Sequence, residues 1–201
     1  MKTPSSAAIV MCLLGVAAMP AAAQSPLATT TESAVDATVG NQVLQLRYLG
    51  KSPFSGIGSN LDYGALLTEN REFIASAALM FDTDIVPVSR LRLQIGPQFN
   101  LAWLDAPQKT DVSALALGAS ARYQLLRRIG LSAFGSAYYS PGVLTFGSAH
   151  NMYDFTAGAE ARLAGRLYVL GGYRWLKFTL VNQPDEKVAN ELFGGIRWQL
   201  E

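Results

Sequence analysis

Charged side chains recur at alternating positions along the chain, and they are the residues most able to do chemistry. The arginines are Arg92, Arg122, Arg162, Arg174 and Arg197, and the acids are Asp62, Asp154 and Glu160. Each of them stands between two apolar residues, so that in a β-strand all of them share the face opposite the apolar one. Charges that face an enclosed space must pair or stay hydrated. The set predicts either a structural ion-pair network or a narrow arginine-lined path for a solute.

The histidine at position 150 is the residue on which an enzymatic function would depend. His150 is the only histidine, and Ser148 and Asp154 lie close to it in sequence. A lipid hydrolase could use a serine, a histidine and an acid together. No motif of lipid deacylases or palmitoyl transferases surrounds His150, and a single histidine in a polar loop is usually an ordinary surface residue. We therefore expect no enzymatic activity, with a lipid-modifying barrel enzyme as the alternative.

Metal, cofactor and nucleic-acid chemistry find little support in the composition. The only cysteine is Cys12, and one histidine alone cannot build a His/Cys zinc site. The glycines lie within predicted strands rather than in a phosphate-binding loop. The formal charge of +1 falls to about zero once Lys2 is removed with the leader, whereas nucleic-acid binding calls for a basic face. We expect no cofactor, no metal and no nucleic-acid partner.

The elements that carry the charges are long strands of alternating polarity. Residues 152–163 alternate between apolar and polar side chains over about a dozen positions, which is longer than a usual soluble strand. Residues 90–103 and 113–125 repeat the pattern. A strand that is apolar on one face and charged on the other suits a wall between lipid and a polar lumen. The alternative for such strands is a soluble β-sandwich with its apolar face inward.

Two further features favour the membrane barrel. Polar loops near residues 105–111, 141–151 and 181–187 alternate with short turns near 126–129 and 164–166, as expected when the loops face outside and the turns face the periplasm. In this frame the lipid-facing aromatic residues form an outer girdle of Trp103, Tyr139, Tyr153 and Trp175 and an inner girdle of Phe81, Tyr123 and Trp198. Aromatic residues are enriched at both interfaces of a bilayer.

The N-terminus has the pattern of a secretory signal peptide. Lys2 precedes an apolar run over residues 7–19 and the small residues 21–23, which predicts cleavage of residues 1–23. Residues 24–41 then form a flexible segment or a short first strand, and residues 42–201 form the barrel. No other stretch has the roughly 18 continuous apolar residues of a membrane helix.

The predicted fold class is all-β, a closed antiparallel transmembrane β-barrel of eight to ten strands. Eight strands follow from residue 58 onward, and residues 44–48 resemble a ninth. If both chain ends lie in the periplasm the strand number is even, so residues 33–39 would supply a tenth. Ten strands are favoured, and eight with an accessory N-terminal strand is the alternative.

The C-terminal residues resemble the signal that the barrel insertion machinery reads, with matches at Gly195, Trp198 and Leu200. Residues 157–162 (AGAEAR), 171–174 (GGYR) and 194–196 (GGI) show the glycine alternation of small outer-membrane barrels, and the mature chain resembles the YfaZ family. The resemblance implies a barrel in the bacterial outer membrane and little about activity.

The function expected from these observations is that of a small outer-membrane barrel protein, structural or narrow and porin-like, with a charge-filled lumen. Its expected partners are outer-membrane lipid and lipopolysaccharide, together with the insertion machinery during biogenesis. Lys177 follows the outer girdle on the lipid-facing parity, so it is a candidate contact for lipopolysaccharide phosphate.

Overall fold

The computed structural model describes residues 33–51, 58–83, 90–105, 110–181 and 185–200. Its strands are β1 (Ala34–Gly40), β2 (Val43–Lys51), β3 (Ser59–Thr68), β4 (Phe73–Asp82), β5 (Leu91–Leu104), β6 (Thr110–Leu126), β7 (Leu131–Ser140), β8 (Thr145–Gly147), β9 (Ala149–Ala164), β10 (Leu167–Leu180) and β11 (Glu186–Gln199). A 3-10 helix, η1 (Gly142–Leu144), precedes β8. None of the described residues belongs to a helix long and apolar enough to cross a membrane.

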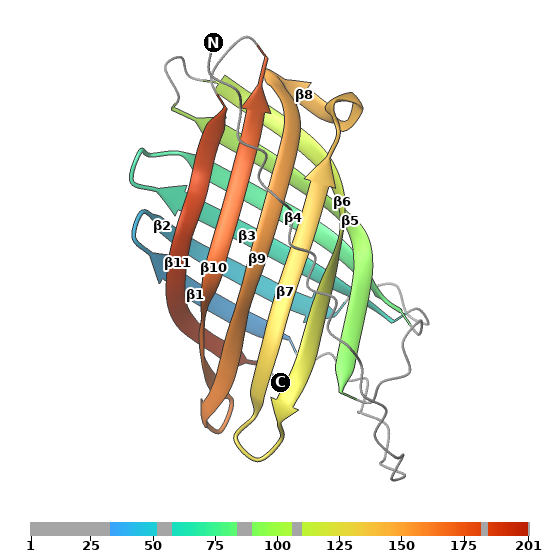
Figure 1. Ribbon diagram of the computed structural model, residues 1–201, viewed down its shortest axis with the longest axis vertical. Coiled ribbons are helices and arrows are strands. Elements are labelled where there is room, and N and C mark those ends of the chain that lie inside the picture. The colour runs from blue at the N-terminus through green and yellow to red at the C-terminus, as the bar shows by residue number, and fades with distance from the viewer. Residues whose placement is uncertain (1–32, 52–57, 84–89, 106–109, 182–184, 201) are drawn as a thin grey trace, which may run out of the picture.

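The strands close into an antiparallel barrel (Figure 1). Successive barrel strands pair as neighbours, and β1 pairs with both β2 and β11, which joins the two ends of the sheet. The three-residue β8 pairs only with β6, so ten of the eleven described strands form the wall. The prediction of ten strands is confirmed, and it includes the one predicted from residues 33–39. The barrel therefore begins at Ala34, before residue 42, while the predicted signal peptide lies outside the described residues.

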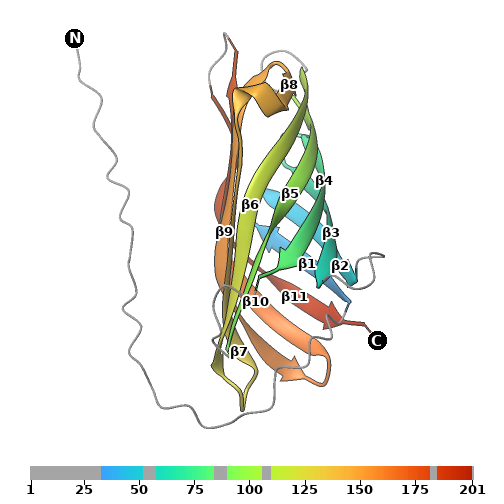
Figure 2. The ribbon, with the colours of Figure 1, turned by 90° about the vertical axis from the view of Figure 1, so that its right-hand side faces the viewer.

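The wall is much taller on one side than on the other. Strands β1 to β4 have 7 to 10 residues, whereas β5, β6, β9, β10 and β11 have 14 to 17. About 9–11 residues of a tilted strand cross a bilayer, so the long strands extend beyond it. Figure 2 shows β8 well above the level of β1 and β2. We call this extended end of the barrel the loop end, and the opposite end, with both termini of the sheet, the turn end.

Connection lengths follow the predicted alternation in only part of the barrel. From β5 onward the loop end has the longer connections and the turn end the short ones, at residues 127–130 and 165–166. In the first four strands the order is reversed, because residues 41–42 and 69–72 make short connections at the loop end. We call the short strands β1 to β4 the low wall and the longer strands opposite them the tall wall. The low wall thus coincides with the short connections at the loop end.

The predicted lipid-facing parity is the outer face of the barrel. The exposed large apolar residues of the strands include Leu46, Tyr63, Phe99, Leu117 and Val169. The aromatic residues expected at the outer girdle contact neighbours along this face: the ring centroids of Tyr139 and Tyr153 lie 4.9 Å apart, those of Tyr153 and Trp175 6.1 Å, and those of Trp103 and Phe73 5.4 Å. At the turn end Tyr123 and Trp198 are 40% and 54% exposed, and Phe81 pairs with Ile95. The height of both sets relative to a bilayer stays a prediction.

The ladder between β4 and β5 is interrupted at Pro97, as its lack of an N–H predicts. Pairing stops between Ala78–Gln98 and Phe81–Ile95. The two strands approach so closely here that a Cβ added to Gly96 would collide with the carbonyl oxygen of Leu79. Glycine is therefore required at this position.

The face assignment predicts a difference between two neighbouring arginine substitutions. Ile95 is 47% exposed on the outer face, whereas Gln94 lines the interior and bonds Asp82. Ile95→Arg should cost about 2–4 kcal/mol of folding free energy in lipid, the cost of a cation near the bilayer midplane. Gln94→Arg should cost less, because its charge reaches the wet interior. Urea titration of folding into phospholipid vesicles measures both, and equal costs would mean that the faces are assigned wrongly.

Candidate functional site

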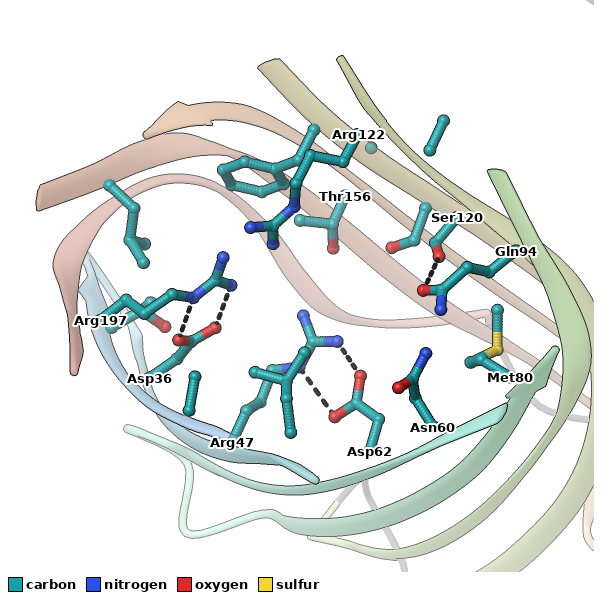
Figure 3. Close-up of a pocket in the computed structure, with 18 of the residues that line it drawn as sticks. Asp36, Arg47, Asn60, Asp62, Met80, Gln94, Ser120, Arg122, Thr156 and Arg197 are labelled. Carbon is teal, nitrogen blue, oxygen red and sulfur yellow. Dashed lines mark hydrogen bonds and ion pairs between the residues drawn. The ribbon is translucent and has the colours of Figure 1, made fainter. Parts of the chain in front are cut away.

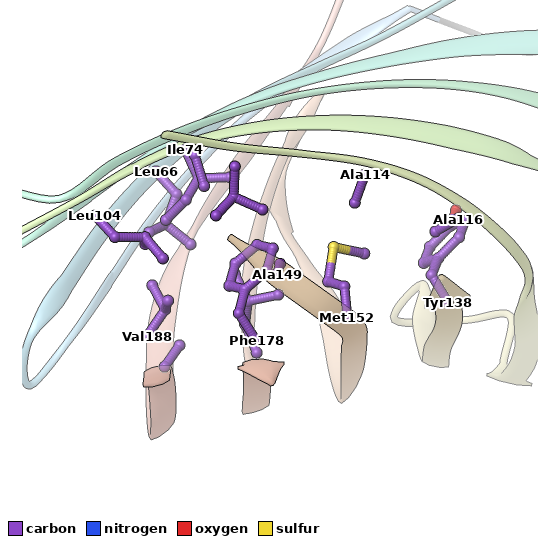
Figure 4. Close-up of a cluster of buried hydrophobic side chains, with 14 of the residues drawn as sticks. Leu66, Ile74, Leu104, Ala114, Ala116, Tyr138, Ala149, Met152, Phe178 and Val188 are labelled. Carbon is purple, nitrogen blue, oxygen red and sulfur yellow. The ribbon is translucent and has the colours of Figure 1, made fainter. Parts of the chain in front are cut away.

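The interior of the barrel is divided into an apolar part toward the loop end and a polar part toward the turn end. The apolar plug, as we call it, is a contiguous set of buried side chains from both walls (Figure 4). It comprises Val43, Leu66, Ile74, Ala78, Met80, Ala102, Leu104, Val112, Ala114, Ala116, Tyr138, Ala149, Met152, Leu176, Phe178, Leu180, Val188 and Ala189. Met152 and Phe178 are fully buried. The plug therefore occupies the interior between the walls toward the loop end.

The plug corrects the expectation that the inward face is polar along the whole barrel. Toward the loop end the strands are apolar on both faces, as in residues 101–104 (LAWL) and 114–117 (ALAL). Their inward members Ala102, Leu104, Ala114 and Ala116 are each at most 2% exposed. Because apolar side chains from facing walls meet there, this part of the interior packs like the core of a soluble protein.

A polar cavity of about 230 Å³ occupies the interior below the plug (Figure 3). Among the described residues, its charged lining consists of Asp36, Arg47, Asp62, Arg92, Arg122, Arg174 and Arg197. A smaller space of about 40 Å³ adjoins it, between the cavity and the plug, and is lined by Gln98, Asn100, Tyr138 and Asp154 among others. The predicted inward charges are thus gathered in the turn-end part of the barrel.

The most deeply buried ion pairs join β1, β6, β9 and β11. Arg197 donates to both carboxylate oxygens of Asp36 at 2.6 Å, and its third nitrogen donates to Oε2 of Glu160. Arg122 donates to the other oxygen of Glu160 at 2.6 Å. The side chains of Arg197 and Asp36 are 6% and 5% exposed, and that of Glu160 is 3% exposed. One carboxylate therefore holds two arginines, and buried charges of this kind are tolerated only when paired.

Two further ion pairs line the interior, one at the turn end between β4 and β5 and one on the low wall between β2 and β3. Arg92 donates to both oxygens of Asp82 at 2.8 Å, and Arg47 pairs with Asp62. The side chains of Arg92 and Arg122 are 40% and 38% exposed, and that of Arg47 is 26% exposed. Arg92, Arg122 and Arg47 are thus the more accessible arginines of the cavity, whereas Arg197, although it lies near the end of β11, is buried.

Three residues of the predicted charge network form no ion pair within the described part of the chain. Arg162 donates to the hydroxyl of Tyr168, and Asp154 accepts from Nε2 of Gln98 at 3.3 Å. Arg174 bonds only neutral groups, the hydroxyl of Thr38 and the amide of Gln45, and its guanidinium lies 4.8 Å from the centre of the Phe193 ring. Arg174 and Asp154 line the interior spaces, whereas Arg162 is exposed, so these three residues do not join the predicted ion-pair network.

Glu191 lies beneath the turn that joins β1 to β2. The backbone N–H of Gln42 donates to Oε2 of Glu191 at 2.7 Å. A Cβ on Gly40 would meet this carboxylate, so a larger residue there would displace the end of the Glu191 side chain. The bond ties the rim of the low wall to the interior of β11.

Asp36 is the most buried of the site residues that the predicted charge network does not include. Residues 24–41 were expected to be flexible or a short strand, and Asp36 was not assigned a role. A signal was present, because Val35, Ala37 and Val39 alternate outward and leave Asp36 on the inward parity. The same parity argument therefore places Asp36 on the inward face, where it can pair with Arg197.

The residues of the predicted insertion signal lie at the seam of the barrel. Gly195 pairs with Thr38, and a Cβ there would collide with the carbonyl oxygen of Ala37. Trp198 faces outward, and the N–H of Leu200 donates to the carbonyl of Ser33 at 2.6 Å. The signal residues therefore also close β11 against β1, while recognition by the insertion machinery stays a prediction.

His150 is exposed at the start of β9, where its backbone carbonyl accepts from the hydroxyl of Thr145 at 3.0 Å. Within the described ranges its imidazole forms no ion pair with a carboxylate, and no group of three or more His, Cys, Asp or Glu side chains could hold a metal ion. The geometry thus adds no observation in favour of the enzyme alternative.

A ten-stranded closed barrel with an apolar outer face defines an outer-membrane barrel protein. The family profile described as "YfaZ precursor" matches residues 10–199, and the chain belongs to this family. The predicted family is confirmed.

Solved structures with a similar chain path include a bacterial polysaccharide outer membrane secretin, with a TM-score of 0.45 and 13% identity over 82% of this chain. The match spans 58% of the secretin chain. Another is the KdgM porin in complex with disordered oligogalacturonate, with a TM-score of 0.42 and 11% identity over 85% of this chain and 100% of the porin. No curated protein matches the sequence.

Proposed function

We propose that the protein is a closed barrel of the bacterial outer membrane with a structural role, and that it does not conduct ions. The apolar plug is the observation that carries the proposal. An ion that crosses the plug would lose its hydration shell without gaining polar partners, and this costs several kcal/mol or more. The plug lies in series with the ion-paired cavity, so a solute must pass both.

The charged cavity supports the same conclusion. Arg197, Glu160 and Asp36 form a buried network whose members hold each other in place. In a barrel of this size side chains can fill the interior. A charge-filled lumen of this kind braces the two walls against each other at the turn end.

The proposed orientation places the turn end in the periplasm. The last strand, β11, ends there beside the start of β1, as expected for a barrel delivered from the periplasm with its C-terminal signal. The loop end then faces outside, where outer-membrane lipid and lipopolysaccharide are the expected partners. Lys177 is at this end and pairs with Asp185, so a lipid phosphate would compete with that carboxylate.

Conductance in a planar bilayer tests the proposal. The purified, refolded protein should insert without steady single-channel currents, because no hydrated path crosses the plug. Sizeable, steady currents from the unmodified protein would contradict the closed barrel. They would favour the porin-like function instead, for which the arginine lining of the cavity is the supporting observation.

A further inference from the structure

We propose that the turn end binds the headgroups of anionic phospholipids in the periplasmic leaflet through a cluster of exposed arginines, which we call the basic rim. The basic rim consists of Arg90, Arg127, Arg128, Arg162 and Arg166. This lipid contact rests on the orientation proposed for the barrel, because phospholipid faces the periplasm and lipopolysaccharide faces outside. It does not depend on whether the barrel conducts.

Two neighbouring turns carry most of the basic rim. Arg127 and Arg128 lie in the turn between β6 and β7, and Arg166 lies in the turn between β9 and β10. Figure 1 shows the two turns side by side, and the backbone N–H of Arg162 donates to the carbonyl of Ile129 at 3.1 Å. The two turns therefore present their arginines on one stretch of the barrel edge.

The rim extends to the start of β5. The carbonyl of Arg90 accepts from the backbone N–H of Gln124 at 2.9 Å, and the side-chain oxygen of Gln124 accepts from Nε of Arg127 at 3.3 Å. These bonds place Arg90 beside the turn between β6 and β7. The five exposed arginines thus follow the end of the tall wall from β5 to β10.

The sequence around the rim contains no acid to neutralise it. No Asp or Glu occurs in residues 85–94, 121–132 or 161–170, and Asp84 and Glu201 lie outside the described residues. The loop end is different, with exposed acids at Glu69, Asp105, Asp111 and Asp185. The turn end therefore has the charge that attracts an anionic membrane surface.

Acids on the strands at this end are engaged inside the barrel. Asp82 accepts both bonds from Arg92 at 2.8 Å, and Glu160 holds Arg122 and Arg197. Their carboxylates are therefore committed to arginines of the interior, and the basic rim faces solvent or lipid headgroups instead.

Exposed apolar side chains between the arginines favour lipid over a soluble acidic partner. Leu125, Leu126, Ile129 and Leu163 are each more than 40% exposed. Surfaces that contact a lipid interface combine basic and apolar side chains, whereas an acidic protein would need only the charge. The outward residues of β6 lead through Tyr123 and Leu125 to the turn, so the rim continues the lipid-facing surface.

The position of the rim along the barrel matches the headgroup layer. Arg127 comes four residues after Tyr123, the predicted residue of the inner girdle. At ~3.3 Å per residue and a tilt of roughly 45°, its backbone lies roughly 9 Å beyond the girdle. The headgroup layer is about 5–7 Å deep, and the long stem of an arginine lets its guanidinium turn back toward the phosphates.

Native mass spectrometry of the refolded mature protein in a neutral detergent tests the lipid class. The probes are phosphatidylglycerol and phosphatidylcholine with identical acyl chains. We expect the dissociation constant of phosphatidylglycerol to be at least about tenfold lower, because each arginine near an anionic surface contributes roughly fivefold. Equal affinity for the two lipids would overturn the proposal, and it would leave the expected absence of channel currents unaffected.

Variants locate the contact on the barrel. Arg127→Gln, Arg128→Gln and Arg166→Gln combined should weaken phosphatidylglycerol binding by at least about tenfold and leave phosphatidylcholine binding unchanged. Lysine at the same three positions keeps the charge and should retain most of the affinity. The matched control is Arg71→Asn, which removes an exposed arginine at the loop end and suits the positive φ of 64° there. An equal loss for Arg71→Asn would contradict a site at the turn end.

Polyglutamate distinguishes lipid from an acidic protein as the partner. It carries anionic charge without a phosphate or an acyl chain. At an equal concentration of anionic groups it should not displace phosphatidylglycerol, because the exposed leucines and Ile129 gain only from lipid. Full displacement by polyglutamate would show that the rim recognises charge alone, and it would overturn the assignment to lipid.

Discussion

Phe178→Ala should destabilise the folded barrel by about 3–5 kcal/mol, the usual cost of removing a buried aromatic side chain. Phe178 is fully buried in the apolar plug, between the tall wall and the low wall. Its neighbours from opposite walls cannot all move together, so truncation leaves a cavity that apolar groups line. The free energy of unfolding in lipid vesicles, from urea titration, measures this cost.

Phe155→Ala is the matched control on the adjacent strand β9. Phe155 is 41% exposed on the outer face, where lipid chains can fill the space that the ring vacates. Its cost should therefore be well below that of Phe178→Ala. Equal costs for the two substitutions, or a larger cost at Phe155, would mean that the plug does not pack as described.

Glu160→Gln should destabilise the barrel by about 3–5 kcal/mol, because breaking a buried ion pair leaves uncompensated charge. Glu160 is 3% exposed and holds both Arg122 and Arg197. The amide can accept a hydrogen bond but cannot neutralise either guanidinium. The same urea titration detects the loss.

Asp185→Asn is the control for this effect of charge removal. Asp185 pairs with Lys177 at the loop end, where its side chain is 43% exposed. Ion pairs in such exposed positions contribute roughly 0–1 kcal/mol. A cost at Glu160 as small as that at Asp185 would show that water screens the interior network and that the cavity is far wetter than the structure indicates.

The sequence was sufficient to predict the barrel and the inward direction of its arginines. Parity alone placed Arg122, Glu160 and Arg197 on one face, because a strand alternates with a period of two. Parity does not give the pairs, since these depend on strand register across the barrel. Arg197, for example, bonds Glu160 on β9 and Asp36 on β1, residues separated by up to 161 positions.

The sequence-based prediction does not include the apolar plug, because it assumes one alternation along the whole of each strand. The residues were visible: Ala114 and Ala116 interrupt the polar parity of β6 at its loop end, while Ser120 and Arg122 resume it. A change of the inward face from apolar to polar within one strand indicates an interior with two environments. The height difference between the walls depends on where hairpins close, which composition does not determine.

The accessibility of two engineered cysteines on β6 tests the central claim most directly. Ser120 lines the cavity, whereas Ala116 is fully buried in the plug, four residues along the same inward face. In the refolded mature protein, which has no native cysteine once Cys12 is removed with the predicted signal peptide, a hydrophilic thiol reagent should modify Ser120→Cys readily and Ala116→Cys at least about a hundredfold more slowly, because only the cavity holds water. Modification of both cysteines at similar rates would contradict a barrel that is closed by its plug.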